Sequence, residues 1–354
     1  MSQDSPVLKY RPADFLVREN LLVPLADRDE ATYRYLLLRK SGYTSFEAMA
    51  LLAERLGCPM EEITYAGLKD EDGITEQLIA VPAALGDTLG EHAPTELTDP
   101  ADPRRLTVLP YGHGTEPLGV GRLEGNSFRI VVRNLAPAVG ERLRSLRKIS
   151  FYALNYYDTQ RFGVPGGPKL THVLGGQVLK GDWDGAFATL LRLQAPETRA
   201  AREWTGSPEA FFKEKLDGRV VNFYLSAWAS HEWNETLAVI VSDAGTSSSY
   251  VHTVEGIDFR YQHRPEATAQ ILHLCPALPY RRLSADPRVP ETSSRRPTVI
   301  QVQIITESVQ DDEFHPGRVS AAVRFALPSG CYATSVLRQL LTPMTTPRQR
   351  SDHA

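Results

Sequence analysis

The order of strand-like and helix-like segments constrains the fold of this chain more than any single motif. In the first half, alternating apolar residues predict strands, at 13–19, 32–39, 76–82 and 117–133. From about residue 165 helical spacing predominates, with predicted helices at 183–194, 208–216 and 219–241. Strand character then returns, at 299–305 and 321–327. A sheet-forming region that is interrupted by a mainly helical block predicts an α+β protein.

The first predicted helix has a clear start and a clear end. Thr44 and Glu47 have the spacing of a capping box, in which each side chain bonds the backbone N–H of the other residue. Apolar residues then recur on one helical face, and Gly57 stands where a left-handed residue ends a helix. We therefore expect an amphipathic helix between these two signals.

Length and charge limit the classes of protein that this chain can represent. With 354 residues it is long enough for two domains, each with its own core. Its formal net charge of −4 argues against a protein that binds nucleic acid non-specifically, because such proteins are usually basic overall. A local basic groove remains compatible with this charge, since attraction depends on where the charges lie.

Cysteine, histidine and apolar residues indicate the compartment. Cys58, Cys275 and Cys331 lie far apart and form no CxxC pair, so we expect no disulfide framework. The histidines are scattered without zinc-binding spacing, so we expect no metal site. The chain shows neither an apolar signal core nor an apolar run long enough to span a membrane. We therefore expect a cytoplasmic protein.

Motifs for common cofactors are poorly matched. The glycines of 119–125 have the wrong spacing for a dinucleotide loop, and no βαβ pattern surrounds them. Segment 70–73 resembles the start of an EF-hand loop, but its glycine comes early and no closing glutamate follows. Neither a phosphate-binding GKS or GKT run nor a GxSxG elbow occurs. We expect no cofactor.

Polar, charged and aromatic residues gather in four segments, at 9–19, 66–77, 125–129 and 155–163. In the second segment, Lys69 and Asp70 follow a strand-like run, where a turn can hold a carboxylate beside a cation. The alternative interpretation is a solvated hairpin tip. The fourth segment combines amides, arginine and aromatic residues, which suits base stacking and phosphate binding, although aromatic clusters more often form core.

These segments, in this order, resemble the tRNA pseudouridine synthase D (TruD) family. The matching runs include Lys9 to Glu19, Ala66-Gly67-Leu68-Lys69-Asp70 with Thr75 and Gln77, Gly125-Asn126-Ser127-Phe128, and Asn155-Tyr156-Tyr157 through Gly163. Two later runs, at 225–234 and 327–338, resemble the family's insertion helix and C-terminal signature. The resemblance covers about residues 9–341.

The resemblance implies a domain organisation that agrees with the change in pattern near residue 165. A pseudouridine synthase catalytic domain with a mixed β-sheet would comprise 1–163 and 306–341. A mainly helical insertion domain specific to the family would comprise 164–305, and 342–354 would be a disordered tail. RNA would bind in a cleft between the two domains.

The resemblance also implies a reaction and its residues. The enzyme would isomerise uridine to pseudouridine without a cofactor, using Asp70 either as a nucleophile or as a base at C2′. The remaining implied residues are Lys9, Phe15, Asn126 and Phe128 around the flipped uridine, with Lys69, Tyr157 and Arg161 in support. A cation beside Asp70 would offset the rise in the carboxyl pKa that burial causes, and Lys9 is the first candidate.

The chain departs from the family pattern where RNA would be expected to bind. Glu71 and Asp72 follow the implied catalytic residue, where the family often has a basic residue, and Tyr157-Asp158 replaces Phe-Gly. Three hypotheses follow: a synthase that acts on tRNA, a specialised synthase that makes pseudouridine nucleotide, for example from UMP, for a C-nucleoside pathway, and an RNA-binding protein with little catalysis. We expect a monomer that needs no membrane and no obligate protein partner.

Overall fold

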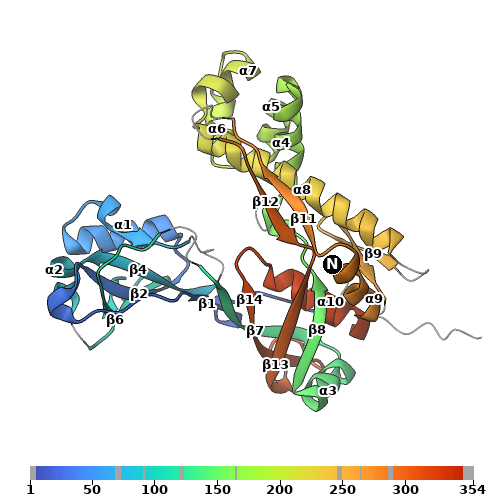
Figure 1. The fold of residues 1–354 in the computed structure, drawn as a ribbon, viewed down its shortest axis with the longest axis horizontal. Helices are drawn as coiled ribbons and strands as arrows, with labels where there is room; N and C mark the ends of the chain where they lie inside the picture. The colour runs from blue at the N-terminus through green and yellow to red at the C-terminus, as the bar shows by residue number, and fades with distance from the viewer. Residues whose placement is uncertain are drawn as a thin grey trace, which may run out of the picture. The chain divides into compact units, whose positions relative to one another are not determined.

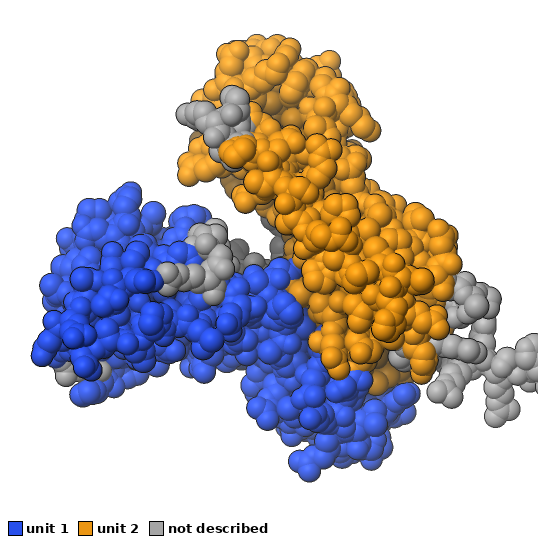
Figure 2. Space-filling model, in the orientation of Figure 1, with its two compact units in different colours: residues 1–150, 302–330, 347–354 blue, residues 151–301, 331–346 orange. Residues whose placement is uncertain are grey.

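The structure is a computed structural model that describes residues 5–67, 73–90, 92–119, 123–163, 166–244, 249–263, 265–285 and 290–345. The chain forms two compact units (Figure 2). Unit 1 is built from 1–150 and 302–330, and unit 2 from 151–301 and 331–346. The units differ from the predicted domains in that 151–163 and 331–341 belong to unit 2. That 164–305 forms a family-specific insertion stays a prediction.

A mixed β-sheet forms the frame of unit 1. Its strands are β1 (Phe15–Asn20), β2 (Tyr33–Ser41), β3 (Thr64–Tyr65), β4 (Ile74–Pro82), β5 (Thr95–Glu96), β6 (Arg105–Gly114), β7 (Gly125–Leu135), β8 (Lys148–Leu154), β13 (Val299–Asp311) and β14 (Val319–Pro328). They follow the order β5-β6-β2-β4-β1-β7-β14-β13-β8, with β3 beside β4. β1 pairs with β4 in parallel and with β7 antiparallel, as expected for a mixed sheet.

Helix α1 (Ser45–Leu56) lies against β2 and β4 (Figure 1). Met49 and Leu52 are buried with Leu36, Leu38 and Ile79 of the two strands. The predicted capping box is present, and Gly57 has a left-handed backbone with φ 68°. Two further helices belong to unit 1, α2 (Ala83–Gly86) and α3 (Pro137–Leu146). Because α1 covers β2 and β4, the part of the same sheet face formed by β1 and β7 is not buried by this helix.

The capping box gives a direct test of how α1 begins. Replacing Thr44 with alanine removes the side-chain acceptor for the backbone N–H of Glu47, which lies 3.2 Å from it. We expect a loss of about 1 kcal/mol in the free energy of unfolding, measured by urea denaturation. Thr236→Ala is the control, since its hydroxyl bonds a carbonyl inside an exposed helix and should change stability by less than about 0.5 kcal/mol. Equal losses would contradict the capping role.

Unit 2 is organised around the long helix α8 (Gly218–Asp243). Helices α4 (Thr171–Lys180), α5 (Trp183–Arg192), α6 (Glu197–Arg202) and α7 (Pro208–Ala210) gather at one end of it (Figure 1). The hairpin β9 (Ser249–Val254) with β10 (Ile257–Gln262) and helix α9 (Pro265–Leu274) lie towards the other end. Two buried clusters, one around Leu190 and Phe211 and one around Leu237 and Phe259, form separate cores.

Two segments differ from their prediction. Residues 276–298 were predicted as loop from their proline and arginine content, but they form the antiparallel ribbon β11 (Ala277–Arg282) and β12 (Thr292–Pro297). A two-stranded ribbon has two free edges, so Pro279 can direct its missing N–H outward. Helix α10 (Ala333–Thr345) extends past Leu341 into the predicted tail, because Leu340 and Leu341 are buried and anchor its last turns.

Membrane-spanning character was also searched for. Within the described ranges, no helix is both long and apolar enough to cross a bilayer.

Candidate functional site

The N-terminal segment brings Lys9 and Phe15 together at the start of β1. The Lys9 ammonium lies 4.5 Å from the centre of the Phe15 ring. Between them, Pro12–Asp14 forms a single 3-10 turn that leads directly into β1. An ammonium over an aromatic face gains electrostatic energy from the ring quadrupole. The two residues therefore form one unit in which a cation is held beside an aromatic ring.

Strand β7 adds the next two predicted residues. Its register opposite β1 places Phe128 beside Val17 and Asn126 beside Glu19. Because directly opposed residues share a face, the Phe128 ring lies next to the Phe15 ring, with 6.2 Å between their centres. Phe325 of β14 stacks on the other side of Phe128 at 5.4 Å. The two site rings are 7% and 8% exposed, so only their edges could contact a ligand.

Several buried polar atoms on this sheet face have unused hydrogen-bonding capacity. Thr75 is opposite Val17 in the parallel pair of β1 and β4, and Gln77 lies two positions further along. Within the residues that the structure covers, Thr75 Oγ1, Gln77 Nε2 and Asn126 Oδ1 have no hydrogen-bond partner. A buried polar atom without a partner costs about 1–3 kcal/mol, which is why most are satisfied. A polar ligand could satisfy these three atoms.

Segment 68–72, with Lys69 and Asp70, lies outside the described residues. The residue that follows it, Gly73, is described and is buried. A Cβ atom placed on Gly73 would lie 2.5 Å from the backbone oxygen of Phe15, so only glycine allows this approach. The chain that leaves the predicted catalytic segment therefore enters β4 in direct contact with Phe15.

A buried ionic network lies behind the N-terminal segment. Arg133 of β7 donates from Nε and Nη2 to the two carboxylate oxygens of Asp14, at 2.6 and 2.8 Å. Burial raises the pKa of the Asp14 carboxyl, but its bonds to Arg133 and Arg11 lower this pKa further, below its ordinary value. The hydrogen bond from Arg133 to Asp14 raises the pKa of the guanidinium. Both groups are therefore charged at neutral pH.

Tyr157 and Arg161, the predicted supporting residues, lie in unit 2 and have structural contacts there. The Tyr157 backbone exchanges two hydrogen bonds with the Asn234 side chain, at 2.9 and 2.8 Å, and the Arg296 guanidinium lies 4.0 Å from the centre of its ring. Burial raises the pKa of the Tyr157 hydroxyl, so it stays neutral. Arg161 donates to Ser230 Oγ at 3.2 Å and lies over Phe223. These contacts favour a supporting role over a chemical one.

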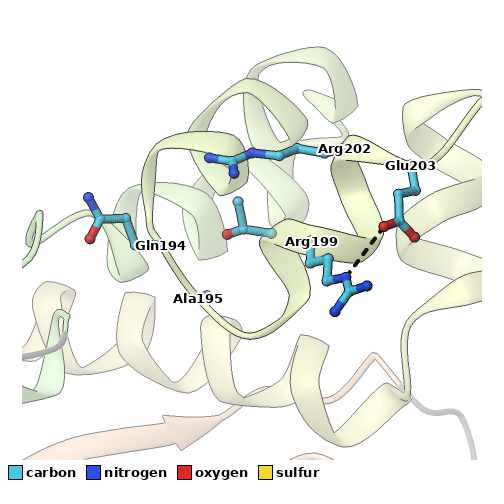
Figure 3. Close-up of a pocket in the computed structure, with 6 residues that line it drawn as sticks. Gln194, Ala195, Arg199, Arg202 and Glu203 are labelled. Carbon is cyan, nitrogen blue, oxygen red and sulfur yellow. Dashed lines mark hydrogen bonds and ion pairs between the residues drawn. The ribbon is translucent and has the colours of Figure 1, made fainter.

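A pocket of about 570 Å³ lies in unit 2, around helix α6 (Figure 3). Its lining residues are Gln194, Ala195, Thr198, Arg199, Arg202 and Glu203. The Arg199 side chain is 90% exposed and pairs with Glu203 on the surface. None of the predicted site residues lines this pocket. The pocket is a shallow surface feature, and it supplies no buried group for catalysis.

Sequence patterns did not single out Arg133 or its partners. A charged residue at the end of an apolar strand is usually exposed, whereas the Arg133 side chain is 2% exposed. Its partners Asp14 and Asp312 come from distant parts of the chain. The one available signal was Asp14 itself, which lies inside the segment that resembles the family signature.

Comparison with known proteins identifies the family. The family model described as tRNA pseudouridine synthase D (TruD) matches residues 5–207. A relative named tRNA pseudouridine synthase D from Geobacter sulfurreducens is 30% identical over 221 residues, which cover 61% of this chain and 50% of the relative. The relative of that name from Shewanella oneidensis is 25% identical, over 93% of this chain and 84% of its own length.

Two limits of coverage and a structural likeness complete the comparison. The chain spans about half the length of the relatives from Geobacter sulfurreducens and Geotalea daltonii. A crystal structure titled as a putative TruD from Methanosarcina mazei has a TM-score of 0.59 and 18% identity, and the match covers 96% of this chain and 94% of that one. This likeness supports the α+β fold alone. By its family-model match, the chain belongs to the tRNA pseudouridine synthase D (TruD) family, as its sequence segments predicted.

Proposed function

We propose that this protein isomerises uridine to pseudouridine in RNA, with tRNA as the favoured substrate and Asp70 as the catalytic carboxylate. One observation supports the site more than any other. Lys9, Phe15, Asn126 and Phe128 come from two neighbouring strands and their leading segment, and they surround the point where the chain that follows Asp70 enters the sheet. The relatives that are named tRNA pseudouridine synthase D support the choice of reaction.

The reaction rearranges bonds within one nucleotide. The bond from N1 to C1′ breaks, the base turns, and a bond from C5 to C1′ forms. C5 loses its proton and N1 gains one, so no electron donor or acceptor is needed. Asp70 would begin this sequence either by attacking the nucleotide or by removing the proton at C2′. Both routes require an ionised carboxylate.

The described residues have definite roles in this proposal. A carboxylate in a partly desolvated pocket needs a nearby cation to keep its pKa low, and Lys9 would supply the positive charge. Because the target base must leave its stack, the edges of Phe15 and Phe128 would hold the flipped uracil. The unpaired atoms of Thr75, Gln77 and Asn126 can bond the polar edge of the base.

Product analysis separates the three hypotheses. Purified protein is incubated with an unmodified tRNA transcript and, separately, with UMP, and the nucleosides are then resolved by chromatography. We expect pseudouridine from the tRNA and none from UMP. Pseudouridine from UMP alone would overturn the RNA substrate and support the specialised synthase. Absence of product from both, with retained RNA binding, would overturn the enzymatic function.

The ribbon of β11 and β12 favours RNA over a free nucleotide. Leu278 is buried, and the Tyr280 hydroxyl donates to the Ser226 carbonyl of α8 at 3.3 Å, so these alternate residues face inward. Arg281 and Arg295 therefore share the opposite, exposed face, and the Arg281 side chain is 72% exposed. A chain with a net charge of −4 that concentrates arginine on one ribbon can attract a polyanion there.

We expect the double variant Arg281→Ser, Arg295→Ser to bind tRNA transcript more weakly. The slope of log affinity against log salt should fall by about 1.5 to 2, because each lost phosphate contact releases fewer counterions. Filter binding over a salt series measures both quantities. The matched control is Arg199→Ser, Arg219→Ser, which removes two arginines that are also exposed and ion-paired in unit 2. Equal effects in both variants would show a loss of overall charge only.

A further inference from the structure

Lys9 has a strained backbone. Its φ is 56°, in the left-handed region that residues with a Cβ atom rarely adopt. Such a conformation costs about 1–3 kcal/mol and persists only where the surrounding structure enforces it. The same conformation accompanies the placement of the Lys9 ammonium over the Phe15 ring at 4.5 Å. Whatever enforces the strained backbone therefore also places the ammonium.

One residue, Arg133, holds both ends of the segment that contains Lys9. At the first end, its backbone N–H and carbonyl exchange two hydrogen bonds with Val7, at 2.9 and 3.0 Å. At the second end, its guanidinium makes the forked contact with both carboxylate oxygens of Asp14, the residue just before Phe15. A planar fork on a carboxylate fixes orientation as well as distance. The chain from Val7 to Asp14 is thus clamped at both ends by a single strand residue.

The clamp is itself held from its other side. The Arg133 guanidinium donates to Asp312 Oδ1 at 3.2 Å, and Asp312 also accepts from the backbone N–H groups of Asn134 and Phe314 at 2.8 and 3.0 Å. The Phe314 ring lies 4.6 Å from the guanidinium. The other charged or titratable groups of the network are Arg11, Glu313 and His315. Arg133 has little freedom to move independently of β7.

We propose that Arg133 is a positioning residue for pseudouridine formation, which clamps the segment from Val7 to Asp14 so that Lys9 and Phe15 stand in their working positions. This inference rests on the proposed function, since Lys9 and Phe15 are assigned to the uridine site there. Its chemistry goes further, because Arg133 itself touches neither the Lys9 side chain nor the reacting base. A residue that only stabilised the fold would affect stability without a selective effect on the chemical step.

The variant Arg133→Lys tests the clamp. Lysine keeps one positive charge between Asp14 and Asp312 but cannot form the fork. With a tRNA transcript as substrate, we expect kcat to fall about 100-fold, because a displacement near 1 Å can cost this much, and KM to change less than about threefold. The control is Arg338→Lys, which removes another buried arginine–aspartate contact, to Asp158 at 2.9 Å in unit 2. We expect the control to keep kcat within about threefold at a comparable loss of Tm.

Amide hydrogen exchange provides a readout that does not depend on activity. In Arg133→Lys, peptides that cover 8–14 should exchange at least about tenfold faster, while peptides that cover α1 should not change beyond the global loss of stability. Asp14→Asn is a milder second variant, since Asp312 still pairs with Arg133, and it should shift exchange and kcat in the same direction. Unchanged exchange over 8–14, or equal losses of kcat in Arg133→Lys and Arg338→Lys, would overturn the proposal. If the wild-type protein makes no pseudouridine, the proposed function fails, and the exchange result still decides whether the clamp exists.

Discussion

Replacing Asp70 with asparagine is expected to lower the rate of pseudouridine formation by about 10⁴-fold or more, the scale seen when a catalytic group that acts directly is removed. The amide has nearly the same shape as the carboxylate, but it can neither attack a sugar or base carbon nor accept the C2′ proton. RNA affinity should change by less than about threefold, because one neutralised acidic residue alters the attraction for phosphates only slightly. Single-turnover kinetics and filter binding measure the two effects separately.

The segment itself offers a matched control for this substitution. Asp72→Asn makes the same chemical change two residues away and removes the same charge. If Asp70 alone carries the chemistry, the Asp72 variant should keep its turnover within about tenfold, which is at most about 1.4 kcal/mol of barrier. Retained turnover in Asp70→Asn, or an equal loss in both variants, would contradict the assignment of Asp70.

Replacing Arg133 with methionine is expected to cost about 3–5 kcal/mol in the free energy of unfolding at neutral pH. The substitution leaves the Asp14 and Asp312 carboxylates buried without their main counter-charge; their side chains are 1% and 0% exposed. Urea denaturation of the purified variant measures the loss. Adding Asp14→Asn to the methionine variant should recover part of this stability, because the uncompensated charge is then removed. A loss below about 1 kcal/mol would contradict the energetic account of the network.

The cost of Arg133→Met should shrink in acid. In the wild type, bonds from Arg133 and Arg11 outweigh burial and hold the pKa of Asp14 below its ordinary value. Asp14 therefore stabilises the fold above the pKa of the unfolded chain, near 3.9, and this contribution is lost as the pH falls through the lower folded-state pKa. Without Arg133, burial raises the pKa of Asp14, and the variant gains relative stability where this carboxyl is protonated. Denaturation midpoints between pH 3 and 7 test the sign.

Local signals in the sequence predicted local structure well. The spacing of Thr44 and Glu47 and the position of Gly57 gave both ends of α1, because caps depend on residues that are close in sequence. The alternation of apolar residues predicted β1, β2 and β4, since strands with one buried face repeat every second residue. The candidate residues Lys9 and Phe15 are close in space as well as in sequence.

Long-range features could not be read in this way. The pairing of Val17 with Phe128 and with Thr75 depends on strand register, which no local pattern specifies. The contact between Arg133 and Asp312 spans most of the chain and leaves no periodic signal. Composition also misled for the ribbon of β11 and β12, because Pro279 is typical of loops and only its place on a free edge makes a strand acceptable.

The most direct measurement of the central claim is the release of tritium from a tRNA transcript whose uridines carry tritium at C5. Isomerisation replaces the bond from C5 to hydrogen by the bond from C5 to C1′, so each pseudouridine formed releases one tritium to water. We predict time-dependent release by the wild-type protein, in an amount that matches the pseudouridine found in the same RNA, and no release by Asp70→Asn. Absence of release by the wild-type protein from RNA that it binds would contradict the account.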